Sequence, residues 1–491
     1  MRLVIRADGG PQIGGGHIMR CLTLAGEAAR RGHDVQFVVG ESPIAQRVRD
    51  VGFAVAELPT QAHPPEAHPP HAGWLPAPWQ VDADFTARVV AETQADWLVW
   101  DHYGLDGRWV AALRAARPDM RVLALDDLDD RELGSDLALD PARIESAARR
   151  HPVPATLDGP QYALLRPEFA ALRPAALARR DGTVRRVLIL PGMMDAAGLA
   201  PAALRALAGT GLQVEVVMCS ASQSEAQVQA MVATCADWTL TLDATDMAQR
   251  MADADLCIGA GGGTAWERCS MGLPSVAVAV ADNQVAGIAV LAEAGAVIPA
   301  TLDNLRDGVA QAQASLPALA GQAARLCDGQ GAARVLDALE AHLRPVTQAD
   351  AHLIFEWRNQ PHIRAASHIQ APLVWKDHLS WVGRTLQRSD TLWRIYQEGE
   401  RDLGAVLITD QGGGLWKWSF YIGAQGAPRG AGGRMLSAAL RAVEGAPDAA
   451  MIEGEVLEGN AASVKLHERL GFVAAPSDKA GVLVFRRQIC D

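Results

Sequence analysis

The strongest constraint on the fold of this chain is a strand that runs into three consecutive glycines before a helix, within the stretch Ile258–Gln284. The apolar run Leu256–Ala260 ends at four turn-forming positions, Gly261, Gly262, Gly263 and Thr264. Backbone N–H groups at such a turn, together with the positive end of the helix dipole, form an anion site. Glu267 lies one helical turn further on and can accept hydrogen bonds from a pair of sugar hydroxyls, and Asn283 and Gln284 can reach back toward the same crevice. The stretch therefore predicts a site for the phosphates and ribose of a nucleotide.

The length and charge of the chain exclude several classes of protein. At 491 residues it is too long for one ordinary core, so we expect two to four domains. Its formal net charge of -12 argues against nucleic-acid partners and against an anionic membrane surface. No apolar run is long enough to span a bilayer. The seven cysteines are scattered without a C-x-x-C pair, which argues against a disulfide framework or a zinc site and favours the cytoplasm; no metal is expected.

Residues 1–145 are predicted to form a doubly wound α/β lobe. Apolar runs typical of buried parallel strands alternate with helical stretches such as Ile18–Arg31 and Leu105–Ala116. The predicted strands are Arg2–Asp8, Asp34–Val39, Phe53–Leu58, Asp96–Asp101 and Arg121–Asp126. A proline- and histidine-rich segment, Pro59–Trp79, is predicted to be an exposed flexible loop. Metal binding is the alternative for its histidines, but no carboxylate pair or cysteine completes a ligand set around His63, His68 and His71.

Polar residues gather where the strands of this lobe end. His17 begins a helix after Asp8 and a glycine turn that contains Gly14, Gly15 and Gly16. Two other interpretations stay open there: a Rossmann dinucleotide turn, whose G-x-G-x-x-G pattern is not cleanly met, and a plain tight turn with a surface histidine. The fifth strand ends at Asp126, and the fourth ends in Asp101, His102 and Tyr103. We expect these residues at one edge of the sheet, although each could instead be a helix cap.

Residues 146–340 are predicted to form a second α/β lobe, which follows a helical and irregular bridge that contains Arg166. The predicted strands are Val184–Leu190, Gln213–Cys219, Trp238–Leu242, Asp255–Ala260 and Pro274–Val280. Ligands of such sheets bind beyond the carboxyl ends of the strands, so the two lobes are expected to face each other across a cleft.

Residues 346–491 are predicted to be a separate α+β unit after a short linker at Pro345. Helices at Asp350–Asn359 and Trp375–Gln387 precede strands in meander spacing. The predicted strands are Leu392–Gln397, Asp402–Thr409, Leu415–Ile422 and Ile452–Leu457. A basic glycine loop at 427–434 opens a helix after the third of these strands, which suits a pyrophosphate.

Two features of this last unit resemble the GNAT-type N-acetyltransferases. Residues 429–433 resemble the acetyl-CoA pyrophosphate loop of that superfamily, and Asn460 with the run 470–472 resembles its second signature. The resemblance implies acetyl-CoA as co-substrate, bound by Ile422, Arg429, Gly430, Gly432, Gly433, Arg434 and Asn460. It implies a general acid for the departing thiolate at His467, where the family often has tyrosine, with Tyr421 or water as the alternative. Arg434 fills a place that is often held by a small residue.

Residues 1 to about 340 resemble the UDP-sugar hydrolase of pseudaminic acid biosynthesis, a relative of the GT-B glycosyltransferases. The resemblance rests on the stretches 13–17, 101–104, 126–128, 162–169 and 258–284. It implies a fold class of two GT-B-like doubly wound lobes followed by the GNAT domain. It also implies that UDP-2,4-diacetamido-2,4,6-trideoxy-β-L-altropyranose is hydrolysed at its anomeric C–O bond, and that the GNAT domain acetylates the 4-amino group of the UDP-amino-sugar precursor.

The same resemblance assigns roles to residues of the two lobes. His17 is the general base and Tyr103 holds the sugar or the water. The implied substrate contacts are Asp8, Gly14, Gly15, Gly16, Asp101, His102, Asp126 and Arg166. The implied UDP contacts are Gly261, Gly262, Gly263, Thr264, Glu267, Asn283 and Gln284. The alternatives are a GT-B glycosyltransferase, a related hydrolase of another nonulosonate pathway, a noncatalytic nucleotide-sugar-binding regulator, and a GNAT domain that acetylates a protein or another amine.

Overall fold

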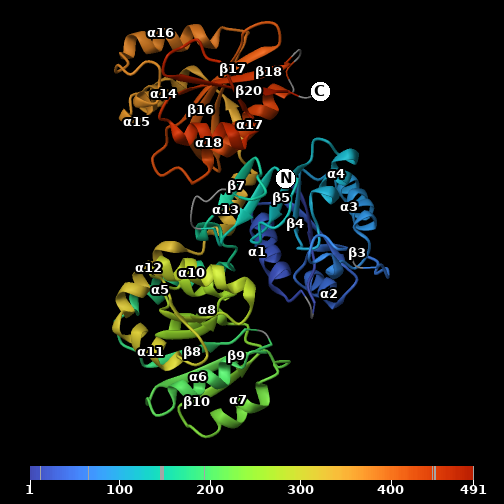
Figure 1. Ribbon diagram of the computed structural model, residues 1–491, viewed down its shortest axis with the longest axis vertical. Helices are drawn as coiled ribbons and strands as arrows, with labels where there is room; N and C mark the ends of the chain where they lie inside the picture. The colour runs from blue at the N-terminus through green and yellow to red at the C-terminus, as the bar shows by residue number, and fades with distance from the viewer. Residues whose placement is uncertain are drawn as a thin grey trace.

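The computed structural model describes residues 1–10, 13–64, 66–143, 149–192, 194–444, 446 and 449–489, with the backbone alone at Asn283. It contains three sheets, each with its own helices (Figure 1). The first two sheets are parallel and the third is largely antiparallel. The predicted order of two doubly wound α/β lobes followed by an α+β unit is thereby confirmed.

The first lobe is a parallel sheet in the order β3-β2-β1-β4-β5-β6-β7. Its strands are β1 Arg2–Ala7, β2 Asp34–Gly40, β3 Ala54–Leu58, β4 Trp97–Asp101, β5 Arg121–Leu125, β6 Leu137–Asp140 and β7 Ala155–Asp158. Its helices are α1 Gly16–Arg30, α2 Pro43–Asp50, α3 Trp79–Thr93 and α4 Gly107–Ala116. Alternate residues of β1 enter opposite cores, Leu3 and Ile5 beside α1 and Val4 beside α3 and α4.

The second lobe is a parallel sheet in the order β10-β9-β8-β11-β12-β13. Its strands are β8 Arg186–Leu190, β9 Gln213–Met218, β10 Trp238–Leu242, β11 Leu256–Ala260, β12 Ser275–Val278 and β13 Ile298–Ala300. Its helices are α5 Pro167–Ala178, α6 Leu199–Leu207, α7 Glu225–Val232, α8 Met247–Asp253, α9 Thr264–Ser270, α10 Val285–Glu293, α11 Leu305–Ala314 and α12 Leu316–Leu326. Helix α5 begins with Pro167, and the N–H that proline lacks would have had no partner in the first turn of the helix. Helix α6 follows Gly198, whose positive φ is a conformation that glycine adopts readily.

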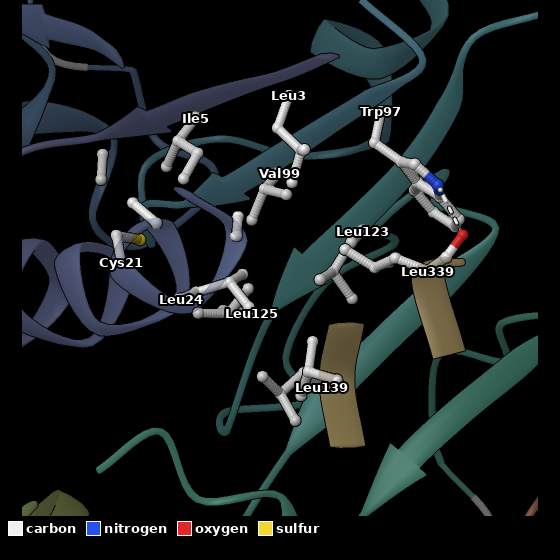
Figure 2. Close-up of a cluster of buried hydrophobic side chains, with 14 of the residues drawn as sticks. Leu3, Ile5, Cys21, Leu24, Trp97, Val99, Leu123, Leu125, Leu139 and Leu339 are labelled. Carbon is white, nitrogen blue, oxygen red and sulfur yellow. Dashed lines mark hydrogen bonds between the residues drawn. The ribbon is translucent and has the colours of Figure 1, made fainter. Parts of the chain in front are cut away.

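The boundary between these lobes differs from the predicted break at residue 145. Strand β7 lies beyond that position but pairs with β6 in the first sheet. Helix α13, Gly331–Leu339, was assigned to the second lobe by its place in the chain, yet its apolar face packs against α1 in the first. Arg31 binds Asp337 and Glu340 at 2.8 and 2.7 Å, and the Trp97 indole donates to the Leu339 carbonyl at 3.1 Å (Figure 2). The chain thus crosses to the second lobe after residue 162 and returns at residue 331.

The third unit is a sheet in the order β14-β15-β16-β17-β18-β20-β19. Its strands are β14 His342–Pro345, β15 Thr391–Glu398, β16 Arg401–Asp410, β17 Leu415–Ile422, β18 Met451–Leu457, β19 Val473–Ala475 and β20 Val482–Gln488. Its helices are α14 Ala351–Arg358, α15 Pro361–Ala365, α16 Trp375–Leu386, α17 Ala431–Glu444 and α18 Ala461–Arg469. The predicted linker at Pro345 is wrong, because residues 342–345 are the edge strand β14, where a proline is tolerated.

Candidate functional site

The carboxyl edge of the first sheet holds a histidine–aspartate pair. His17 lies in the first turn of α1, and its Nδ1 is 2.5 Å from an oxygen of Asp101, the last residue of β4. A carboxylate only accepts, so Nδ1 carries the proton and Nε2 is left as the acceptor. Within the described residues Nε2 has no hydrogen-bond partner, and 8% of the His17 side chain is exposed. This arrangement places a proton acceptor at the edge where the strands end.

Arg20 fixes the orientation of this pair. Its guanidinium donates to both oxygens of Asp101, at 2.5 and 2.6 Å. Burial alone would raise the pKa of Asp101, but Arg20 and then His17 hold it well below its usual range. Asp101 therefore stays ionised and stabilises an imidazolium at His17. Arg20 was not predicted as a site residue, although its i,i+3 spacing from His17 places both side chains on one helical face.

Aromatic rings lie beside the His17–Asp101 pair. Tyr103 stands edge-on to His17 with ring centroids 4.6 Å apart, and its hydroxyl donates to Asp127. His71 and Trp74 lie 5.6 and 6.0 Å from the Tyr103 ring, and both come from the proline- and histidine-rich segment. That segment was predicted to be an exposed loop, and most of its described residues from 59 to 70 are exposed, whereas residues 71–79 pack against the lobe, with Leu75 and Ala77 buried. These ring contacts were not predicted from the sequence, since rings in a proline-rich stretch give no periodic signal.

Two predicted substrate contacts have other partners instead. Asp8 accepts from the Gly40 N–H at 2.6 Å and from Arg6 at 2.7 Å, so both of its oxygens are bound inside the lobe. His102 is buried and accepts at Nδ1 from the Gly104 N–H, and burial lowers its pKa to about 3. These contacts favour a structural role for both residues.

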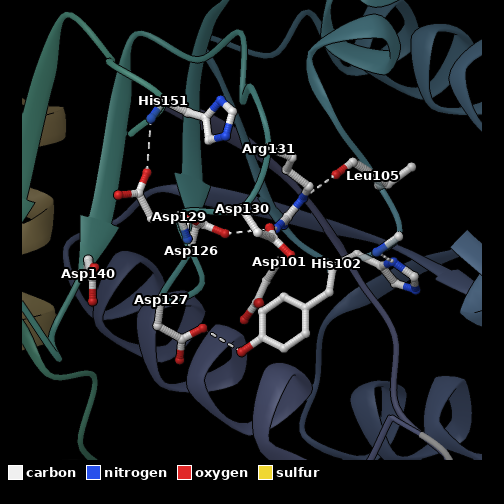
Figure 3. Close-up of polar contacts among 12 residues, drawn as sticks. Asp101, His102, Leu105, Asp126, Asp127, Asp129, Asp130, Arg131, Asp140 and His151 are labelled. Carbon is white, nitrogen blue, oxygen red and sulfur yellow. Dashed lines mark hydrogen bonds and ion pairs between the residues drawn. The ribbon is translucent and has the colours of Figure 1, made fainter. Parts of the chain in front are cut away.

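Carboxylates surround the ends of β5 and β6 (Figure 3). Asp126 is bound by Arg149 at 2.6 Å and by Arg131 at 3.0 Å. Burial, reinforced by Asp127, raises the pKa of Asp140 to about 7. In the predicted glycine turn, a Cβ added at Gly14 or Gly16 would meet no heavy atom within 4 Å. This edge of the sheet is therefore acidic, arginines bind some of its carboxylates, and there is open space next to Gly14 and Gly16.

The glycine turn of the second lobe offers backbone donors. Within the described residues, the amides of Gly262, Gly263 and Thr264 have no acceptor. Gln284 accepts from the N–H groups of Gly261 and Val280 at 3.1 and 3.2 Å, so it shapes the turn rather than reaching out to a ligand. The side chain of Asn283, also predicted to bind here, lies outside the described residues.

Glu267, a predicted UDP contact, and Arg166, a predicted substrate contact, lie close to each other beside this turn. The Arg166 guanidinium lies 3.6 Å from Glu267 and 3.3 Å from Glu168. Burial raises the pKa of Glu267 to about 7. Arg166 directly precedes α5, where the chain crosses between the lobes. A carboxyl that titrates near neutrality and a cation thus flank three free amides.

The third unit has its own candidate site between two diverging strands. β17 and β18 pair from Leu415 to Trp418, and among the described residues Ser419–Ile422 have no strand partner on the β18 side. Within the described part of the chain, the amides of Gly430, Gly432 and Gly433 at the start of α17 have no acceptor. A Cβ added at Gly432 would lie 3.7 Å from the Ile422 side chain, so the glycine loop lies next to the unpaired end of β17. An extended ligand can pair with the open strand edge and place an anion on the glycine loop.

Three residues predicted to act in this site have partners within the protein. His467 is fully buried, donates at Nδ1 to the Ser463 carbonyl at 2.8 Å and accepts at Nε2 from the Trp418 indole at 3.1 Å. Both ring nitrogens are thus occupied beneath Gly454, and burial lowers the pKa of His467, which argues against a role as general acid. Asn460 caps α18 by accepting from the Ser463 N–H at 3.2 Å. Arg434 is buried, and its guanidinium donates to Glu398 and to the carbonyls of Arg429 and Thr156, so it has partners within the protein.

Neither a metal centre nor a membrane span was found in the described residues. No group of three or more His, Cys, Asp or Glu side chains there is placed to hold an ion. No helix there has the length and hydropathy needed to cross a bilayer.

Comparison with known proteins identifies both parts of the architecture. Residues 341–473 match the family described as Acetyltransferase (GNAT) domain, so the third unit is a GNAT domain. The structure of MurG from Acinetobacter baumannii is similar at a TM-score of 0.51 and 16% identity, covering 69% of this chain and 99% of MurG. At this identity the likeness concerns the fold, and it shows that the first two lobes are GT-B-like.

Two acetyltransferase structures each cover 30% of this chain. Aminoglycoside acetyltransferase AAC(6')-Ib in complex with coenzyme A has 15% identity and a TM-score of 0.28, covering 30% of this chain and 95% of its own. N-acetyltransferase PseH of Campylobacter jejuni has 14% identity and a TM-score of 0.25, covering 30% of this chain and 97% of its own. No curated protein sequence matches the chain.

Proposed function

We propose that the two GT-B-like lobes hydrolyse UDP-2,4-diacetamido-2,4,6-trideoxy-β-L-altropyranose to UDP and the free sugar. We further propose that the GNAT domain acetylates the 4-amino group of the UDP-amino-sugar from which that substrate is made, as consecutive steps of pseudaminic acid biosynthesis. The observation that carries the first activity is the His17–Asp101 pair, whose free Nε2 lies at the carboxyl edge of the sheet. A glycosyltransferase would use such a base on an acceptor hydroxyl, so the two activities are distinguished by whether sugar is released without an acceptor.

Hydrolysis requires a base on one side of the anomeric carbon and a stabilised leaving group on the other. A water oxygen attacks C1 while its proton passes to Nε2 of His17, and Asp101 stabilises the resulting imidazolium. The C1–O bond to UDP breaks, and UDP leaves with the bonding electrons. The free amides of Gly262, Gly263 and Thr264 would bind the diphosphate charge as it develops.

Glu267 is proposed to accept hydrogen bonds from the ribose hydroxyls of UDP. Its pKa is raised to about 7 by burial, so it is mostly protonated at pH 6 and ionised at pH 8. Because only the carboxylate accepts from both hydroxyls, we expect UDP affinity to rise with pH through 7. Glu267→Gln should remove this rise and weaken UDP binding about tenfold at pH 8. Calorimetric titration of both proteins with UDP at pH 6, 7 and 8 measures the difference, and parallel pH profiles would contradict this role.

In the GNAT domain, the neutral 4-amino group would attack the thioester carbonyl of acetyl-CoA. The C–N bond forms, the C–S bond breaks, the amine loses a proton to solvent and the coenzyme A thiolate takes one up. Tyr421 on the open strand edge is the proposed proton donor in place of His467, since its hydroxyl has no hydrogen-bond partner within the described residues. Burial raises its pKa, so the phenol remains protonated at neutral pH.

Replacing Tyr421 by phenylalanine is expected to lower kcat for acetyl transfer about 10²-fold, because water must then protonate the thiolate. Thiol release at saturating acetyl-CoA measures this step. UDP release by the same variant is the internal control and should equal that of the unmodified protein. An unchanged rate of acetyl transfer would show that water, and not Tyr421, is the general acid.

The proposed pair of activities is tested by product analysis. The protein is incubated with the UDP-diacetamido sugar in the absence of any acceptor, and separately with the UDP-4-amino sugar and acetyl-CoA. Mass spectrometry should find UDP with free reducing sugar in the first mixture and the N-acetylated UDP-sugar in the second. Sugar release that requires an acceptor would identify a glycosyltransferase instead, and an unacetylated UDP-sugar would leave a protein or another amine as the GNAT substrate.

A further inference from the structure

The glycine loop of the GNAT domain lies directly against the first lobe. The main contact joins the start of α17 to β7, the last strand of the first sheet, and Figure 1 shows the GNAT domain seated at this edge. The Tyr162 hydroxyl, from the segment that leaves the first lobe, donates to the Arg429 carbonyl at 3.3 Å. The Arg434 guanidinium donates to the same carbonyl at 3.0 Å and to the Thr156 carbonyl in β7 at 3.1 Å. The Arg429 carbonyl therefore accepts one hydrogen bond from the first lobe and one from the GNAT domain.

These contacts belong to a buried polar network. Arg434 donates through Nε and Nη2 to the two oxygens of Glu398, at 2.6 and 3.2 Å. The Tyr396 hydroxyl also donates to Glu398, at 2.6 Å. Arg434 and Glu398 are 5% and 6% exposed, and Tyr162 is 1% exposed. The donors of Arg434 are divided among Glu398 in its own domain, the glycine loop and the first lobe. These hydrogen bonds hold the buried guanidinium in one geometry.

The loop itself has little freedom at this contact. Gly430 has φ of +82°, and an added Cβ would lie 2.9 Å from the Thr156 carbonyl and from Nη1 of Arg434. The loop backbone thus fits against β7 only as glycine, in a conformation that other residues rarely adopt. The free amides of Gly430, Gly432 and Gly433 take their directions from this same backbone.

We infer that Tyr162 and Arg434 are positioning residues, through which the first lobe holds the glycine loop in the geometry that binds the pyrophosphate of acetyl-CoA. The inference rests on the proposed function of the GNAT domain. It makes the geometry of the acetyl-CoA site depend on contacts with the first lobe. Neither side chain touches the ligand; both act by fixing the carbonyl of Arg429, and so the direction of the amides that follow.

The test measures coenzyme A binding by the full-length chain. Tyr162→Phe deletes one hydroxyl and keeps the ring in its core, so we expect coenzyme A to bind about three- to tenfold more weakly. The double variant Arg434→Met with Glu398→Gln removes both charges and leaves no buried ion unpaired, and should weaken binding about 10- to 100-fold. For both variants, KM for acetyl-CoA should rise in parallel while kcat at saturation stays within about twofold, because the reacting groups are untouched.

Controls separate positioning from general damage. Arg31→Met removes another half-buried arginine of the first lobe, which binds Asp337 and Glu340 and does not contact the loop, so its coenzyme A affinity should be unchanged. UDP release by Tyr162→Phe should equal that of the unmodified protein. Unchanged coenzyme A affinity in both variants, with melting temperatures like that of the unmodified chain, would overturn the inference. Failure of the unmodified chain to bind coenzyme A would instead overturn the proposed acetyl-transfer function on which it rests.

Discussion

Replacing His17 by asparagine is expected to slow UDP release about 10²- to 10⁴-fold, the usual contribution of a positioned general base. Asparagine can still accept from a neighbouring donor but cannot take up the proton of an attacking water. The affinity for UDP should stay within about twofold, since the nucleotide is proposed to bind the second lobe, at Gly262–Thr264 and Glu267. The effect should therefore appear in kcat rather than in the binding constant.

A coupled assay for UDP and a calorimetric titration with UDP measure the two quantities for His17→Asn. Asp101→Asn should also slow release strongly, because an amide no longer fixes the proton on Nδ1 or stabilises the imidazolium. His33→Asn is the matched control, since His33 also pairs with a carboxylate, Glu340 at 2.5 Å, but lies away from the strand ends. It should release UDP at the unmodified rate. Turnover that survives in His17→Asn would show that another group activates the water.

The second large effect is expected in the glycine loop of the GNAT domain. Gly432→Glu should weaken acetyl-CoA binding by at least about 100-fold. The new carboxylate would stand among three amides that are proposed to bind a pyrophosphate, where it would both occupy the space and repel the ligand. The nearest atoms to a Cβ at this position are 3.7 Å away, so the fold itself tolerates a side chain there.

Gly383→Glu is the control for the added charge. Gly383 lies in α16 of the same domain, and a Cβ there would meet nothing within 4 Å. Its affinity for acetyl-CoA, measured by titration calorimetry, should equal that of the unmodified protein, as should UDP release by both variants. Binding by Gly432→Glu at the unmodified affinity would show that the pyrophosphate does not lie on this loop.

The features that the sequence predicted correctly are local. The strand–glycine–helix transition at Gly261–Thr264 and the clustering of Asp101 and Tyr103 at strand ends follow from chain order and from the geometry of parallel sheets. Each depends on residues within one turn or one strand. The fold class was predictable for the same reason, because two alternating α/β patterns and one meander are visible in the apolar periodicity.

The features that the sequence did not predict depend on distant partners. Asp8 was predicted to contact the substrate, but its two carboxylate oxygens accept hydrogen bonds from Arg6 and from the Gly40 N–H. Arg434 was assigned to acetyl-CoA, but its partner Thr156 lies in a strand of the first lobe. Strands of four residues such as β7 and β14 carry too few side chains for a periodic signal, so the lobe boundary and the linker were misplaced.

Solvent labelling tests the central claim most directly. The UDP-diacetamido sugar is hydrolysed by the protein in ¹⁸O-enriched water without an acceptor, and both products are analysed by mass spectrometry. Attack of a His17-activated water at C1 predicts one ¹⁸O in the free sugar and none in UDP. Label in the diphosphate would show that the O–P bond is cleaved, and the absence of UDP release would show that these lobes are not a hydrolase; either result would contradict the account.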